Sequence, residues 1–166
     1  FTSCTMMPCK ADGLPLCLIS PLDKHPHAWP KLWKHHGAQA QADLINEVAR
    51  KRGERWLQRY GGVVSSEWFF PKALEILQNG PGIYRTADIL VEAGDWVVWQ
   101  LTGKLIRSTC QAGYKAFWDK QDGFPPRNFF AALDPRFADV VSTHLEGTFQ
   151  APGTRAGTLV DAMARR

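Results

Sequence analysis

The sequence contains no apolar run long enough for a membrane helix, and its first residues lack the charged-then-apolar order of a signal peptide. A helix that crosses a bilayer needs roughly 20 consecutive, predominantly apolar residues. We therefore expect neither membrane insertion nor export, and we predict a cytoplasmic location.

Cysteine is scarce, and its spacing is uninformative. The four cysteines stand at positions 4, 9, 17 and 110, and no two of them form a CxxC pair. Such spacing is typical neither of a zinc site nor of a disulfide framework. We expect reduced, mostly buried thiols.

The short motifs of several enzyme classes are missing. The sequence lacks the phosphate-binding pattern GxxxxGK followed by Ser or Thr, the dinucleotide-binding GxGxxG, the hydrolase GxSxG and the zinc-binding HExxH. If the protein handles ATP, its phosphate-binding loops lie outside these residues.

Clustered positive charge is also missing. The net charge is +4, from 20 Lys and Arg against 16 Asp and Glu, but the basic residues are scattered apart from Lys51-Arg52 and Arg165-Arg166. Proteins that bind nucleic acids usually concentrate basic residues on one face. We expect no nucleic-acid partner.

The chain does contain enough apolar material for a core, since 45% of its 166 residues are hydrophobic. Apolar runs on both sides of Ala11-Asp12-Gly13 predict a strand–turn–strand hairpin over residues 1–19. Strands with several helices between them favour an α/β or α+β class. The chain begins without Met in strand-like sequence and ends on a helix barely started, so we expect a piece of a longer polypeptide.

Capping residues and glycines delimit the predicted helices. The first helix spans residues 34–50, with a stop at Gly53, and the second spans 71–79, between a cap at Ser65 or Ser66 and a stop at Gly80-Pro81. Residues 95–103 form the third, with Asp95 as cap and Gly103 as stop. Residues 104–119 predict a strand, a turn at Gly113 and a loop, and Asn128 caps a later helix.

The stretch HPHAWPKLWKHH, residues 25–36, holds four of the five histidines and two of the seven tryptophans. A metal site is disfavoured, because adjacent histidines on a helix point about 100° apart and Asp23 is the only nearby acid. Trp33 suits core packing, the commoner role of tryptophan. It also suits a sugar pocket, where an aromatic face packs on the C–H side of a sugar. The residues alone leave these two roles open.

The chain resembles the bacterial ribulokinases, which belong to the FGGY carbohydrate kinases. The matching segments occur in the same order and cover nearly all 166 residues: FTSCTMMP, PHAWPKLWKHHGAQ, RYGGVVSSEWFFPKALEIL, EAGDWVVWQLTGK, CQAGYKAFWDKQDGFP, ALDPR and GTRAG. The segments KLWKHH, SSEWFFPK and AGYKAFW distinguish ribulokinases from the glycerol and xylulose kinases of the family.

The resemblance implies an α/β fold, as part of a ribonuclease-H-like (actin-like ATPase) lobe with a mixed sheet and flanking helices, incomplete at both ends. Residues 1–166 would form part of the N-terminal, sugar-binding domain. The catalytic aspartate would lie beyond Arg166, followed by the nucleotide lobe, so this segment alone would be inactive.

The full-length enzyme, by this resemblance, would use ATP and Mg²⁺ to phosphorylate the 5-hydroxyl of L-ribulose in arabinose catabolism, and a homodimer is a possible assembly. Two alternatives stay open: another pentulose kinase, acting on D-ribulose or xylulose, and a non-catalytic carbohydrate-binding domain.

The resemblance also implies five substrate-binding residues. Thr2 and Ser3 would face the sugar hydroxyls, and the small Ser3 would leave room for a five-carbon ketose. Trp33 would pack on the sugar, Glu67 would stand near it, and Lys115 would hydrogen-bond its hydroxyls. The resemblance assigns no catalytic, cofactor-binding or metal-ligating residue to this segment, and it gives His27, His35 and His36 a supporting role.

Overall fold

The computed structural model describes residues 4–165. At its centre, β1 (Met6–Cys9) pairs antiparallel with β2 (Ile89–Glu92), with Met6 opposite Glu92 and Cys9 opposite Ile89. A second pair joins β3 (Ile106–Ser108) in parallel to β4 (Thr148–Gln150). We predicted one mixed sheet. Among the described residues, the strands instead form two separate two-stranded sheets, one antiparallel and one parallel. The α/β class is as expected.

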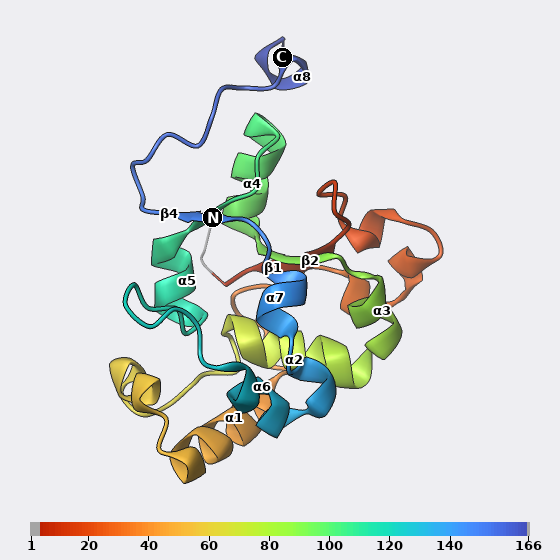
Figure 1. Ribbon diagram of the computed structural model, residues 1–166. Helices are drawn as coiled ribbons and strands as arrows, with labels where there is room; N and C mark the ends of the chain where they lie inside the picture. The colour runs from red at the N-terminus through yellow and green to blue at the C-terminus, as the bar shows by residue number, and fades with distance from the viewer. Residues whose placement is uncertain (1–3, 166) are drawn as a thin grey trace.

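Helices surround these strands (Figure 1). They are α1 (Gln39–Arg52), α2 (Phe69–Asn79), α3 (Pro81–Thr86), α4 (Ala93–Thr102), α5 (Thr109–Lys115), α6 (Arg127–Leu133), α7 (Val140–His144) and α8 (Asp161–Ala164). Short 3₁₀ helices span Leu16–Leu18, Leu22–Lys24, Pro26–Ala28, Arg55–Tyr60 and Pro135–Phe137. Figure 1 shows α1 and α6 at one end of the molecule and α8 at the other, beyond α4. In residues 4–165, none of the helices combines the length and apolar character that crossing a bilayer requires.

The predicted helix ends are confirmed at three glycines. Gly53 follows α1 and Gly103 follows α4, both in the left-handed conformation that glycine adopts without a steric penalty. Gly80 separates α2 from α3, which begins at Pro81.

The predicted N-terminal hairpin is wrong. The turn is present, since Gly13 has a φ of 86° and the Leu14 N–H donates to Asp12 Oδ1 over 2.9 Å. After it, however, residues 16–18 form a 3₁₀ helix, and β1 pairs with β2 from about 80 residues further along the chain. Pro15 makes only an isolated bridge to Cys9, because proline has no N–H for a ladder.

Several helix starts also differ from the prediction. Helix α1 begins at Gln39 rather than at residue 34, because hydrogen bonds to other elements hold the residues before Gly37 out of the helix. Neither Ser65 nor Ser66 caps α2, whose N-cap is Trp68, and α6 starts after Pro126 rather than at Asn128. The predicted turn at Gly113 lies inside α5, which Ser108 caps.

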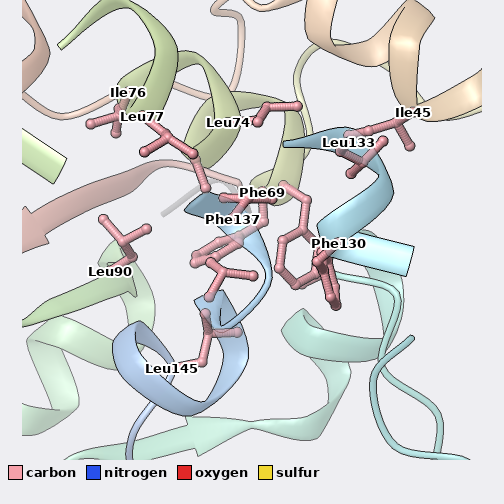
Figure 2. Packing of buried hydrophobic residues seen from close by; sticks show 14 of the residues in the cluster. Ile45, Phe69, Leu74, Ile76, Leu77, Leu90, Phe130, Leu133, Phe137 and Leu145 are labelled. Atoms are coloured by element: carbon pink, nitrogen blue, oxygen red, sulfur yellow. The ribbon is translucent and has the colours of Figure 1, made fainter. Parts of the chain in front are cut away.

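An aromatic cluster forms the core between α1, α2, α6 and the strands. Phe70 lies at its centre, with its ring centroid 5.0 Å from that of Phe117 and 4.8 Å from that of Phe130. Figure 2 shows aliphatic side chains from several elements around the rings of Phe69, Phe130 and Phe137, among them Ile45, Leu74, Leu77, Leu90, Leu133 and Leu145. Apolar residues from distant parts of the sequence therefore hold α2 against the strands.

Candidate functional site

A cleft of about 580 Å³ opens beside the C-terminal end of α5. Its wall combines aromatic and charged side chains: Arg59, Tyr60, Trp68, Tyr114, Lys115, Trp118, Asp119 and Lys120, with Gly113. Flat apolar rings next to hydrogen-bonding groups suit a small polar ligand that has an apolar face, as a sugar does.

The backbone before and after Lys115 is held by contacts to other elements. The Tyr60 hydroxyl donates to the Gly113 carbonyl over 2.7 Å. Phe117, two residues after Lys115, is fully buried and stacks on Trp56 and Phe70, with centroids 4.4 and 5.0 Å apart. The backbone around Lys115 is thus anchored while its side chain stays accessible at a wall of the cleft.

Trp33 and Glu67 do not line this cleft. The Trp33 side chain is 45% exposed in the loop before α1, so it is not a core tryptophan. Glu67 lies just before α2, and its Oε1 stands 3.6 Å from His36 Nε2. This contact joins the loop that carries Trp33 to the segment that carries Glu67.

Lys72 of α2 binds the loop that carries Trp33 and the residue Cys4 from the interior. It is fully buried, and its ammonium donates to the carbonyls of Cys4, over 2.5 Å, and Leu32, over 2.8 Å. Burial lowers the pKa of Lys72 to about 8, with Glu67 opposing the shift and Lys115 adding to it.

Cys4 stands directly after Thr2 and Ser3, which lie outside the described residues. Its φ of 74° is left-handed, and its N–H donates to Glu92 Oε2 over 2.9 Å. Burial raises the pKa of the Cys4 thiol to about 12, so the thiol is not a nucleophile at neutral pH. Lys72 and Glu92 thus hold both the carbonyl and the N–H of Cys4.

A second group of buried charges fixes the start of α5. Asp95 was predicted to cap α4, but it lies inside that helix and accepts hydrogen bonds from Ser108 N and Gln111 Nε2, both over 3.0 Å. Arg107 donates to the carbonyls of Leu90, over 2.9 Å, and Glu146, over 2.7 Å. Burial raises the pKa of Glu92 to about 8 and that of Asp95 to about 6.

Sequence reasoning missed Lys72, Glu92 and Arg107. A signal was present for two of them, because Lys72 interrupts the apolar pattern of α2 and Glu92 ends the apolar run of β2. Their partners are backbone groups of residues far away in the sequence, and no local pattern identifies those.

Within residues 25–36, His27 and His35 lie against other side chains, and His25 accepts a hydrogen bond from the backbone N–H of His27. His35 Nε2 lies 2.8 Å from Glu75 Oε2, and His27 Nδ1 lies 2.9 Å from Lys31 Nζ. Within residues 4–165, no three His, Cys, Asp or Glu side chains are arranged to hold a metal ion. Cys4, Cys9 and Cys17 are buried, and Cys110 is exposed.

No protein-family model matches the chain. Curated ribulokinases match it along nearly its whole length. The enzyme of Geobacillus thermodenitrificans is 52% identical over 164 residues, which cover 99% of this chain and 29% of that protein. That of Halalkalibacterium halodurans is 49% identical over 166 residues, with coverage of 100% and 30%. That of Mycolicibacterium smegmatis is 51% identical over 160 residues, with coverage of 96% and 28%.

The fold resembles that of a solved sugar kinase. The gluconate kinase of Lactobacillus acidophilus superposes with a TM-score of 0.62 at 14% sequence identity, covering 99% of this chain and 30% of that one. At this identity, the likeness concerns the fold alone. The chain spans about 29% of the length of the ribulokinases it matches. The predicted resemblance is thereby confirmed: over nearly all of its residues, this chain is similar to a segment of the ribulokinases.

Proposed function

We propose that this chain forms part of the N-terminal, sugar-binding domain of an ATP-dependent ribulokinase. The observation that carries the proposal is the 49 to 52% identity to ribulokinases over nearly every residue. The likeness in fold to a gluconate kinase supports a kinase lobe, for which we propose the ribonuclease-H-like architecture.

The reaction we propose for the full-length protein is transfer of the γ-phosphoryl group of ATP to the 5-hydroxyl of L-ribulose, with Mg²⁺. Such transfer depends on a positioned hydroxyl, metal-held phosphates and a group that accepts the hydroxyl proton. Residues 4–165 contain neither a phosphate-binding loop of the common kinds nor an acidic cluster for a metal. We therefore assign ATP, Mg²⁺ and the catalytic aspartate to the remainder of the enzyme.

In this proposal the present segment binds and orients the sugar. Lys115 donates hydrogen bonds to its hydroxyls, and its positive charge favours the developing phosphate. Trp33 offers an accessible ring to the C–H face of the sugar, and Glu67 accepts hydrogen bonds from hydroxyls. Thr2 and Ser3 complete the site. The accessibility of Trp33 and the position of Lys115 at the cleft wall support these roles.

A substrate panel on the full-length protein tests the proposed function. Initial rates of ATP-dependent phosphorylation would be measured for L-ribulose, D-ribulose, xylulose, glycerol and gluconate. We expect kcat/KM for L-ribulose to exceed the others by about tenfold or more, since a site that hydrogen-bonds each hydroxyl discriminates against misplaced ones.

Two results would contradict the proposal. A clear preference for D-ribulose or xylulose would identify another pentulose kinase. Sugar binding in a calorimeter without any phosphorylation would identify a non-catalytic carbohydrate-binding protein.

A further inference from the structure

Helix α2 turns two buried charged side chains toward the loop that carries Trp33. Lys72 is fully buried, and Glu75 is only 5% exposed. They stand three residues apart and therefore share one face of the helix. A buried charge is costly unless it is paired or hydrogen-bonded, so the partners of these two side chains show what they hold.

The partners lie on both sides of Trp33. The Lys72 ammonium donates to the carbonyl of Leu32, the residue before Trp33, over 2.8 Å. Glu75 Oε2 lies 2.8 Å from Nε2 of His35, two residues after it, and 3.6 Å from Nζ of Lys31. The segment with Trp33 is thus fastened to α2 at both ends.

The same ammonium fastens the start of β1. Lys72 Nζ donates to the Cys4 carbonyl over 2.5 Å, next to the residues proposed to face the sugar hydroxyls. Two backbone hydrogen bonds between Met6 and Lys31, over 3.0 and 2.8 Å, continue the connection. Lys72 and this backbone pair together therefore set the distance between two chain segments that are distant in sequence.

The Trp33 ring depends on this fastening for its position. Its side chain is 45% exposed, so core packing does not fix it. The loop around it contains a single turn hydrogen bond, from His35 N to Leu32 O, over 2.9 Å. The side chains of α2 therefore supply much of the constraint on the backbone that carries the ring.

We propose that Lys72 and Glu75 are positioning residues of the sugar site, which hold the backbone on both sides of Trp33 and, through Lys72, place it at a fixed distance from Cys4. This inference rests on the proposed function, because it requires that Trp33 and the residues before Cys4 contact the sugar. Neither side chain contacts the sugar in this proposal.

The test compares Lys72→Met and Glu75→Gln with the wild type in the full-length enzyme. Methionine keeps the apolar stem of Lys72 without its donors, and glutamine keeps the shape of Glu75 without its charge. We expect KM for L-ribulose to rise and kcat/KM to fall by roughly 10- to 100-fold in Lys72→Met, and by less in Glu75→Gln, with KM for ATP unchanged. Hydrogen exchange of residues 32–34 should become faster in both variants.

Asn46→Ala is the matched control. Asn46 is a buried polar residue of α1 whose side chain makes two hydrogen bonds to the backbone of Val64, over 2.7 and 2.9 Å. Its removal should lower the Tm as the loss of a buried hydrogen-bonding group does, while KM for L-ribulose and exchange of residues 32–34 stay at wild-type values.

Each outcome decides the question. Wild-type KM in both α2 variants, or an equal rise of KM in Asn46→Ala, would overturn the inference and leave the proposed function intact. A wild-type enzyme that does not phosphorylate ribulose would remove the proposed function, and this inference with it. If Lys72→Met does not fold, Glu75→Gln alone decides by the same criteria.

Discussion

The aromatic core and the polar layer formed by Lys72, Glu75 and Glu92 are both buried. Helix α2 contributes side chains to both, but the core is apolar and the layer is made of ionisable side chains. Phe70 packs against several other aromatic rings, among them Phe117 and Phe130. Lys72, two residues later, packs among backbone carbonyls. Glu92 extends the polar layer on β2.

The two regions contribute differently: the aromatic core stabilises the fold, and the polar layer positions particular backbone groups. Ring packing is favourable in many arrangements, so it stabilises the fold without fixing a particular distance. A buried charge must meet a specified donor or acceptor, so it costs desolvation but fixes which backbone group lies beside it. We therefore expect changes in the aromatic core to affect stability most, and changes in the polar layer to affect the site most.

The largest expected effect is on the core. Phe70→Ala should lower the free energy of unfolding of the chain by about 3–5 kcal/mol, because it removes a fully buried ring and leaves a cavity among its neighbours. Chemical denaturation measures this. Val63→Ala, at a side chain that is 54% exposed, is the control and should change the value by less than about 0.5 kcal/mol. A loss for Phe70→Ala as small as that of the control would mean that the core does not depend on ring packing.

A smaller effect, confined to activity, is expected at the proposed sugar contacts. Lys115→Ala and Trp33→Ala in the full-length enzyme should each lower kcat/KM for L-ribulose by roughly 10- to 100-fold, since each removes a contact to the substrate. The thermal unfolding temperature should stay near the wild-type value, because neither side chain is buried. Lys24→Ala and Trp29→Ala change an exposed lysine and an exposed tryptophan that are not proposed to contact the sugar, and they serve as controls. Unchanged kinetics in both site variants would remove Lys115 and Trp33 from the site.

The smallest expected effect is on the pH dependence of stability, through Glu92 of the polar layer. Burial raises the pKa of Glu92 from 4.5 to about 8, so the folded state binds this proton more tightly than the unfolded state does. The associated stability is therefore fully present below pH 4.5 and is lost as pH rises through about 8. Glu92→Gln cannot ionise but keeps an oxygen for the Cys4 N–H.

The variant should accordingly lose less stability than the wild type across this pH range, because its side chain has no proton to release. Denaturation at several pH values checks this. Parallel pH profiles for the two proteins would show that Glu92 keeps its charge in the folded state.

Local features were predictable where one residue type decides the geometry. The stops at Gly53 and Gly103 follow from the freedom of glycine to adopt a left-handed conformation. The partner of β1 was not predictable, because β2 lies about 80 residues away and the nearer segment begins with Pro15. Asp95 illustrates the same limit, since its hydrogen-bonding partner is Ser108 on the following strand.

Residue identity and order are enough to establish the similarity of this chain to a segment of the ribulokinases and its α/β class. How the segments that carry the proposed sugar contacts are held follows from the folded chain alone. Lys72, Glu75, Glu92 and Arg107 acquire their roles when folding removes their ionisable groups from water and leaves particular backbone and side-chain groups as the available partners. Which groups those are depends on three-dimensional proximity, and sequence spacing does not contain that information.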